Sequence, residues 1–243
     1  RSGTEITIPD VIPTGSLMFD EFLDGGFRSG LWIRFFSEPE CGKSLIGLAF
    51  AKAWQDKYGK DACVIIFNAE GRISYDLVAR SGVNTDKAVF RIIDSNVSDM
   101  IWSFMDKLIK NNPEGKKYFF LVDSTDACNR IQDEEKEVGD AEKIGGSATI
   151  ISAAGKRLSL PFSRSGHVLF MTSQVRDKMN TRSPAMAGKD ASGGNAPKFY
   201  SSLTGEIKKP WSDTYIFENP SDTKSKIIGR MVEIKFIKTR SEE

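Results

Sequence analysis

Apolar residues along this chain follow two alternating patterns: short, mostly apolar runs, and longer stretches with helical spacing. The short runs have the length of β-strands and cover residues 31–36, 63–68, 88–93, 118–122, 167–172 and 231–237. Residues 44–54 and 97–109 place apolar side chains three and four positions apart, which is typical of helices with a buried face. Strands that are apolar throughout and alternate with helices are typical of a sheet covered on both faces. The pattern therefore predicts an α/β fold with a mostly parallel central β-sheet flanked by helices.

Two polar stretches interrupt this alternation. Residues 129–146 are rich in charge and end in Gly145-Gly146, and residues 177–195 combine Pro184 with glycines and several cations. Loops of this length inside a compact domain are usually functional or mobile. The sequence shows no internal repeat and no convincing second domain, so we expect one domain over residues 1–243.

The composition, with 40% apolar and 28% charged residues, is ordinary for a globular protein. A net charge of +1 gives no strong overall attraction to nucleic acid, so DNA binding would require a local patch. No apolar run reaches the roughly 20 residues of a membrane-spanning helix, and no apolar segment follows Arg1 as in a signal peptide. Three widely spaced cysteines (Cys41, Cys63 and Cys128) favour a reducing, cytoplasmic compartment. The single histidine, His167, lies in an apolar run, and we expect it to be structural.

The segment between the first apolar run and the first predicted helix has the form of a phosphate-binding loop. It reads Ser37-Glu38-Pro39-Glu40-Cys41-Gly42-Lys43-Ser44. Backbone N–H groups of such a loop wrap phosphates, and the positive end of the helix dipole adds attraction. Lys43 is predicted to reach the β- and γ-phosphates of ATP, and the Ser44 hydroxyl to bind Mg²⁺. An ordinary strand–helix turn is the alternative.

Polar side chains follow three other apolar runs. Asp123 ends the run 118–122 and is predicted to hold the Mg²⁺ shell, although an Asp there is by itself more often a helix cap or turn residue. Glu70 follows residues 63–68 and is predicted to orient or deprotonate the water that attacks the γ-phosphate. Gln174 follows residues 167–172 and is predicted to sense that phosphate by hydrogen bonding. Because parallel strands place their carboxyl ends at one edge of a sheet, these residues predict a site for ATP hydrolysis.

Further short motifs occur along the chain before and after the residues described so far. The N-terminal motifs are Ile12-Pro13-Thr14-Gly15-Ser16-Leu17, Gly25-Gly26, the phosphate loop, Asn68-Ala69-Glu70, Ser81-Gly82-Val83 and Leu121-Val122-Asp123-Ser124. The C-terminal motifs are Ser173-Gln174-Val175-Arg176 and Gly193-Gly194-Asn195-Ala196-Pro197-Lys198-Phe199-Tyr200. Taken in order, these motifs resemble those of the RecA/UvsX family of strand-exchange recombinases. The last motif is the most diagnostic, and the resemblance covers nearly the whole chain. It implies a RecA-like P-loop NTPase core.

The resemblance implies a DNA-dependent ATPase that uses ATP and Mg²⁺, forms a helical filament on single-stranded DNA and pairs it with double-stranded DNA. Nucleotide and metal roles are implied for Lys43, Ser44 and Asp123, catalysis for Glu70, and coupling of the γ-phosphate to DNA binding for Gln174. Lys238 and Arg240 match cations that reach the ATP of a neighbouring subunit, with a solvated strand end as the alternative on the residues alone. Single-strand-binding and mediator proteins are further implied partners, in a cytoplasm that belongs to an infected host if a phage encodes the protein.

The two polar stretches fall where the family has its two DNA-binding loops. Ile144 and Met179 match apolar residues that insert between DNA bases, with core packing as the alternative for each residue alone. Cations and small residues of the second stretch are predicted to contact the DNA backbone. They are Arg176, Lys178, Arg182, Lys189, Gly193, Gly194 and Asn195. A solvated loop is the alternative on composition alone.

Departures from the family pattern leave other functions open. Ser37 replaces the first glycine of the phosphate loop, and Ser74 and Leu77 stand where bacterial members have an Asp and a Tyr near the adenine. We also expect this chain to lack the family's N-terminal polymerisation segment and C-terminal domain. One alternative is therefore a recombinase paralogue that acts as a mediator with weak ATPase activity. A helicase motor on the same core is another, although the motif at 193–200 fits it poorly.

Overall fold

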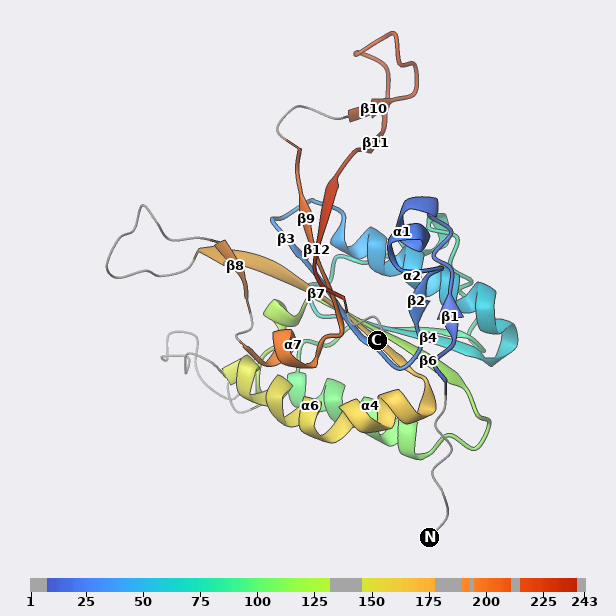
Figure 1. The fold of residues 1–243 in the computed structure, drawn as a ribbon, viewed down its shortest axis with the longest axis vertical. Coiled ribbons are helices and arrows are strands. Elements are labelled where there is room, and N and C mark those ends of the chain that lie inside the picture. The colour runs from blue at the N-terminus through green and yellow to red at the C-terminus, as the bar shows by residue number, and fades with distance from the viewer. Residues whose placement is uncertain (1–7, 132–145, 178–188, 193–194, 211–214, 240–243) are drawn as a thin grey trace.

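A seven-strand path forms the centre of the molecule, in the order β12-β9-β3-β7-β6-β4-β5 (Figure 1). The computed structural model describes residues 8–131, 146–177, 189–192, 195–210 and 215–239. The strands of the path are β3 (Trp32–Ser37), β4 (Ala62–Asn68), β5 (Phe90–Ile93), β6 (Lys117–Asp123), β7 (Val168–Asp177), β9 (Leu203–Lys208) and β12 (Glu233–Thr239). Neighbours from β9 to β5 are parallel, whereas β12 runs antiparallel to β9. The predicted α/β fold with a mostly parallel sheet is confirmed.

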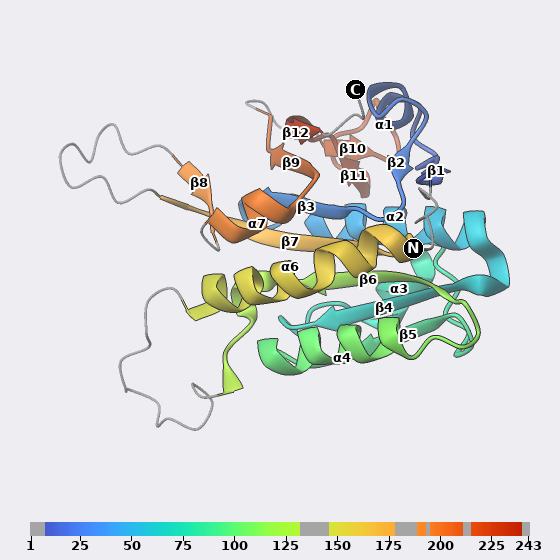
Figure 2. The same cartoon turned by 60° about the horizontal axis from the view of Figure 1, so that its bottom comes forward.

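Helices cover both faces of this sheet (Figure 2). They are α1 (Leu17–Phe22), α2 (Lys43–Tyr58), α3 (Tyr75–Arg80), α4 (Ser98–Lys110), α6 (Gly146–Ser165) and α7 (Asn195–Tyr200). On β6, Phe119 and Leu121 enter the apolar cluster that α2 completes, and Phe120 and Val122 enter the cluster of α4 and α6. Because successive side chains of a strand point to opposite faces, a strand buried on both sides is apolar along most of its length. Within the described residues no helix is both long enough and apolar enough to cross a bilayer.

Short strands and turns complete the described chain. They are β1 (Val11–Ile12) with β2 (Phe27–Arg28), β8 (Lys189–Ala191), β10 (Tyr215–Phe217) with β11 (Ile227–Arg230), and the 3₁₀ turns η1 (Gly59–Asp61) and η2 (Thr125–Ala127). The hairpin of β10 and β11 projects away from the sheet between β9 and β12 (Figure 1).

Several element boundaries differ from those predicted. Ala88 and Val89 precede β5, and Met231 and Val232 precede β12. The strand predicted at 167–172 begins one residue later and continues to Asp177, so Gln174 lies within β7 rather than after it. The predicted helices at 44–54 and 97–109 are present as α2, which is longer, and α4. The apolar pattern does not predict α6, whose sequence contains Pro161 near its end.

The helices and strands beside the two polar stretches, 129–146 and 177–195, extend into the residues predicted to be loop. Gly146 begins α6, Asp177 ends β7, and Asn195 begins α7. Lys189–Ala191 forms β8, which pairs antiparallel with the end of β7. Backbone hydrogen bonding therefore extends further into these segments than their polar composition indicates.

His167 is structural, as predicted. It is buried, and its Nδ1 accepts a hydrogen bond from the Tyr118 backbone N–H at 3.2 Å. Burial, assisted by the nearby Lys117 ammonium, lowers the pKa of His167 to about 4. The imidazole is therefore neutral at neutral pH.

Candidate functional site

A tight loop joins β3 to α2 at one edge of the sheet. β3 ends at Ser37, and α2 begins at Lys43 after Gly42, which has a φ of 86°. This left-handed conformation is easily reached only without a Cβ atom. Glu40 in the same loop also has a positive φ of 61°, which is uncommon for a residue with a side chain. No side chain caps the start of α2, so its first backbone N–H groups face the loop.

Lys43 folds back over this loop. Its Nζ donates to the Ser37 carbonyl oxygen at 3.3 Å, the Ser37 hydroxyl at 3.0 Å and the Glu38 carbonyl oxygen at 3.0 Å. Burial lowers the pKa of Lys43, and the Cys41 thiol and the carboxylates of Asp123 and Glu70 oppose that shift. Neutral oxygens thus hold the ammonium at the loop, where an anionic ligand would be a stronger partner.

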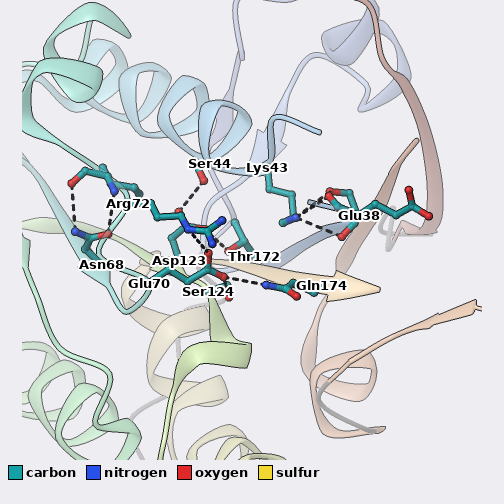
Figure 3. A network of polar contacts seen from close by, with 12 residues as sticks. Glu38, Lys43, Ser44, Asn68, Glu70, Arg72, Asp123, Ser124, Thr172 and Gln174 are labelled. Atoms are coloured by element: carbon teal, nitrogen blue, oxygen red, sulfur yellow. Dashed lines mark hydrogen bonds and ion pairs between the residues drawn. The ribbon is translucent and has the colours of Figure 1, made fainter. Parts of the chain in front are cut away.

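Asp123, at the carboxyl end of β6, faces the start of α2 (Figure 3). Its Oδ2 accepts from the Ser44 hydroxyl at 2.7 Å, and its Oδ1 accepts from the Thr172 hydroxyl at 2.5 Å. The parallel pairing of Val122 with Met171 sets Thr172 of β7 beside Asp123. A hydroxyl and a carboxylate oxygen are ligands that Mg²⁺ accepts, and Mg²⁺ in nucleotide sites usually takes one or two protein ligands besides phosphate and water. The pair of Ser44 and Asp123 fits that role.

Glu70 lies in the turn after β4 and is joined to the same edge. Its Oε1 accepts from the Ser124 hydroxyl at 2.5 Å and from the Gln174 side-chain amide at 3.3 Å. Its backbone N–H donates to the Asp123 carbonyl oxygen at 3.2 Å. The Gln174 backbone N–H donates to the Asp126 carboxylate at 2.6 Å, which ties β7 to the turn after β6. The carboxyl ends of β4 and β6 and the middle of β7 therefore lie beside the loop after β3, at the one edge that the sequence predicts.

Comparison with known proteins identifies the family. Residues 3–242 match the family model described as the RecA N-terminal domain. The chain belongs to the RecA family. It is 28% identical over 232 residues to "Protein RecA" of Xanthomonas axonopodis pv. citri (strain 306) and 27% identical over the same length to "Protein RecA" of Xylella fastidiosa (strain 9a5c). Each alignment covers 95% of this chain and 62% of the relative, so the chain spans less than two thirds of these RecA proteins.

Within this RecA-family core, the structure brings together Lys43, Ser44, Glu70, Asp123 and Gln174. The remaining loop residues Glu38, Pro39, Glu40 and Cys41 lie between β3 and α2. Cys41 is buried, and its Sγ donates to the Pro39 carbonyl oxygen at 3.6 Å. The phosphate loop and the acidic residues predicted from separate motifs thus share one site.

Lys238 is not part of this cluster. It lies on β12, and its Nζ donates to the carbonyl oxygens of Lys198 and Phe199, at 2.9 Å and 3.1 Å, near the end of α7. Among the predicted DNA-contacting residues, Arg176 lies on β7, Lys189 on β8 and Asn195 at the start of α7. The others, together with Arg240, lie outside the described residues; they are Ile144, Lys178, Met179, Arg182, Gly193 and Gly194.

Three residues of the site have no counterpart in the sequence predictions. Thr172 and Ser124 each donate to one of the key carboxylates, and Arg72 lies 3.6 Å from Glu70 through its Nε. Thr172 could have been found by aligning the ends of the apolar runs in parallel register, which sets it beside Asp123. Nothing in the local sequence marks Arg72. Over the described part of the chain, no group of three or more His, Cys, Asp or Glu forms a separate metal site.

Proposed function

We propose that this chain is the ATP-hydrolysing core of a RecA-type recombination protein. The observation that carries the proposal is the 2.7 Å hydrogen bond between the Ser44 hydroxyl and the Asp123 carboxylate. Beside it lies the Lys43 ammonium, whose described hydrogen bonds are all to neutral oxygens. A hydroxyl, a carboxylate and a lysine in this arrangement suit a magnesium-bound triphosphate.

Each residue then has a physical role. The backbone N–H groups of residues 40–44 and the Lys43 ammonium bind phosphate oxygens, because the helix dipole and the charge both favour anions there. Ser44 and Asp123 hold Mg²⁺, which when bound neutralises charge that develops on the phosphates. Glu70 orients the attacking water and accepts its proton. Ser124 and Gln174 fix the Glu70 carboxylate through Oε1.

Gln174 also suggests how this site communicates with DNA. Its side chain contacts Glu70, and its strand β7 continues to the pairing with β8 and the second polar stretch. We propose that this stretch, with the one at residues 129–146, binds single-stranded DNA in a filament and aligns it with double-stranded DNA. Bound ATP then favours the DNA-binding state of the filament, and ATP hydrolysis ends that state and releases the DNA. Lys238 and Arg240 contact the nucleotide of a neighbouring subunit in this proposal.

Nucleotide binding and hydrolysis, with and without single-stranded DNA, test the proposal. Lys43→Ala should abolish nucleotide binding, whereas Glu70→Gln should retain binding and lose turnover. Single-stranded DNA should stimulate hydrolysis by the wild type, and electron microscopy with a non-hydrolysable ATP analogue should show regular filaments. Equal hydrolysis by wild type and Glu70→Gln would reject the assigned base.

A mediator with weak ATPase activity is the second candidate, and the loop itself favours it. Glu40 holds a left-handed φ of 61°, and the exposed loop residues Glu38 and Glu40 add negative charge where phosphates would bind. The negative charge weakens triphosphate binding relative to a loop of neutral residues, and the left-handed φ makes this loop conformation more costly than it would be with glycine. DNA binding by isolated particles, without filaments and without DNA-stimulated hydrolysis, would favour the mediator.

A further inference from the structure

An arginine at the mouth of the site contacts the carboxylate assigned as the general base. Gly71, with a φ of 68°, turns the chain after Glu70 and is followed by Arg72. Arg72 Nε lies 3.6 Å from Glu70 Oε2, and Figure 3 shows its side chain directed from this turn toward Glu70. The Arg72 side chain is 74% exposed, whereas the Glu70 side chain is 18% exposed. The guanidinium thus approaches the catalytic edge from the solvent side.

The two oxygens of Glu70 have different surroundings. Oε1 accepts hydrogen bonds from the buried Ser124, which follows β6, and from the partly buried Gln174 within β7. Oε2 has the Arg72 guanidinium as its described ionic partner. Oε1 is therefore anchored to the fold, while Oε2 is the oxygen left to act on a water molecule. A cation resting against Oε2 competes with that function.

The contact between Arg72 and Glu70 is easily exchanged. An ion pair of this length between a largely exposed arginine and a carboxylate contributes little, because water screens it. The terminal phosphate of a nucleoside triphosphate carries more negative charge than a carboxylate and accepts a bidentate contact from a guanidinium. It would also lie close by, because Glu70 is joined through the Asp123-Ser124 dipeptide to Ser44.

We infer that Arg72 is a sensor of the terminal phosphate. Its guanidinium pairs with Glu70 when the site holds no triphosphate and transfers to the γ-phosphate when a triphosphate binds, which frees Oε2 for water. This inference rests on the proposed function, because it requires the nucleotide to bind at the loop after β3. It assigns to Arg72 the distinction between nucleoside triphosphate and diphosphate.

A purely structural role for Arg72 predicts a different effect on nucleotide binding. If Arg72 only stabilised the turn after β4, its loss would weaken both nucleotides equally, because both use the same loop and the same metal ligands. Selectivity between triphosphate and diphosphate is therefore the decisive measurement, and it does not depend on turnover.

The test compares the magnesium-dependent dissociation constants of a fluorescent non-hydrolysable ATP analogue and of the matching ADP derivative. Arg72→Gln should weaken the triphosphate about tenfold, the factor expected for one charge-assisted hydrogen bond, and leave the diphosphate within about twofold. Arg72→Lys, which keeps the charge but not the planar fork, should recover part of the loss. Arg80→Gln is the matched control, since Arg80 is 71% exposed and pairs with Asp76 on α3 at 2.9 Å.

Equal weakening of both nucleotides, or no weakening of either, would overturn the role of Arg72. These outcomes differ from failure of the proposed function, in which the wild type itself binds neither nucleotide, or Lys43→Ala binds both as well as the wild type does. Thermal unfolding of Arg72→Gln without nucleotide should match that of the wild type, because the exposed pair contributes little to stability. An unfolded variant would also overturn the inference, since it would show that Arg72 is needed for the fold.

Discussion

The Thr172 hydroxyl offers a sharp test of how the metal site is built. Thr172 is fully buried on β7, and its Oγ1 donates to Asp123 Oδ1 at 2.5 Å, with the Val122 carbonyl oxygen at 3.3 Å. Thr172→Val replaces the hydroxyl by a methyl group of similar size and removes this hydrogen bond while keeping the packing. Asp123 then keeps its Ser44 contact but loses the group that fixes its second oxygen.

The expected magnitude follows from the charge of the acceptor. A hydrogen bond to a charged group contributes about 1.5–3 kcal/mol, because the carboxylate is costly to leave unsatisfied in a buried site. Loss of a group that orients a metal ligand typically weakens metal binding by about 10- to 100-fold. We therefore expect Thr172→Val to raise the Mg²⁺ concentration for half-maximal nucleotide binding by about tenfold. The free energy of unfolding without ligand should fall by about 1.5–3 kcal/mol.

Titration of Mg²⁺ at fixed fluorescent nucleotide measures this effect. Thr125→Val is the matched control, because the Thr125 hydroxyl is also buried but contacts the Thr172 carbonyl oxygen and the Ser173 hydroxyl, each at 3.0 Å, rather than Asp123. Its stability should fall while its Mg²⁺ requirement stays that of the wild type. Identical Mg²⁺ titrations for the two variants would refute the positioning role of Thr172.

Three further predictions concern the backbone, the core and pH. Glu40→Gly should raise the free energy of unfolding by about 0.5–1 kcal/mol in denaturant titrations, because it relieves a left-handed conformation; Glu40→Gln, which keeps the Cβ, should not. Gly155→Ala should lower it by about 1–3 kcal/mol, because an added Cβ would lie 2.3 Å from the Tyr200 ring between α6 and α7; unchanged stability would contradict this packing. The pKa of His167 is lowered from 6.5 to about 4 in the fold, so unfolding takes up a proton in that window and stability falls as pH falls. The loss should be about 3 kcal/mol between pH 6.5 and 4 in excess of that for His167→Gln, and equal pH profiles would contradict it.

Strands buried on both faces could be predicted from the sequence. Strands whose residues are set by contacts with segments distant in sequence could not. β4 and β6 are nearly continuous apolar runs because both of their faces meet helices, and β3 is apolar apart from the buried Arg34 and Ser37. β9 reads Leu-Thr-Gly-Glu-Ile-Lys, and its Gly205 lies where an added Cβ would meet the Phe35 ring at 2.4 Å. That requirement for a small residue arises from packing between segments distant in sequence, and no local pattern reveals it.

The candidate site divides in the same way. Lys43 and Ser44 could be predicted because the phosphate loop is a local structure whose residues are adjacent in sequence. Asp123 and Glu70 follow from the rule that parallel strands end at one edge. Thr172, Ser124 and Arg72 contact these carboxylates only through the register of β6 and β7 and the turn after β4, and register depends on the assembled sheet.

The central claim is that Ser44 and Asp123 hold the magnesium ion of a triphosphate bound at the loop after β3. A crystal structure of the protein with Mg²⁺ and a non-hydrolysable ATP analogue tests it most directly. The account predicts the metal between the Ser44 hydroxyl and the Asp123 carboxylate, with the phosphates on the backbone N–H groups of residues 40–44. A nucleotide bound elsewhere, or a metal that contacts neither residue, would contradict it.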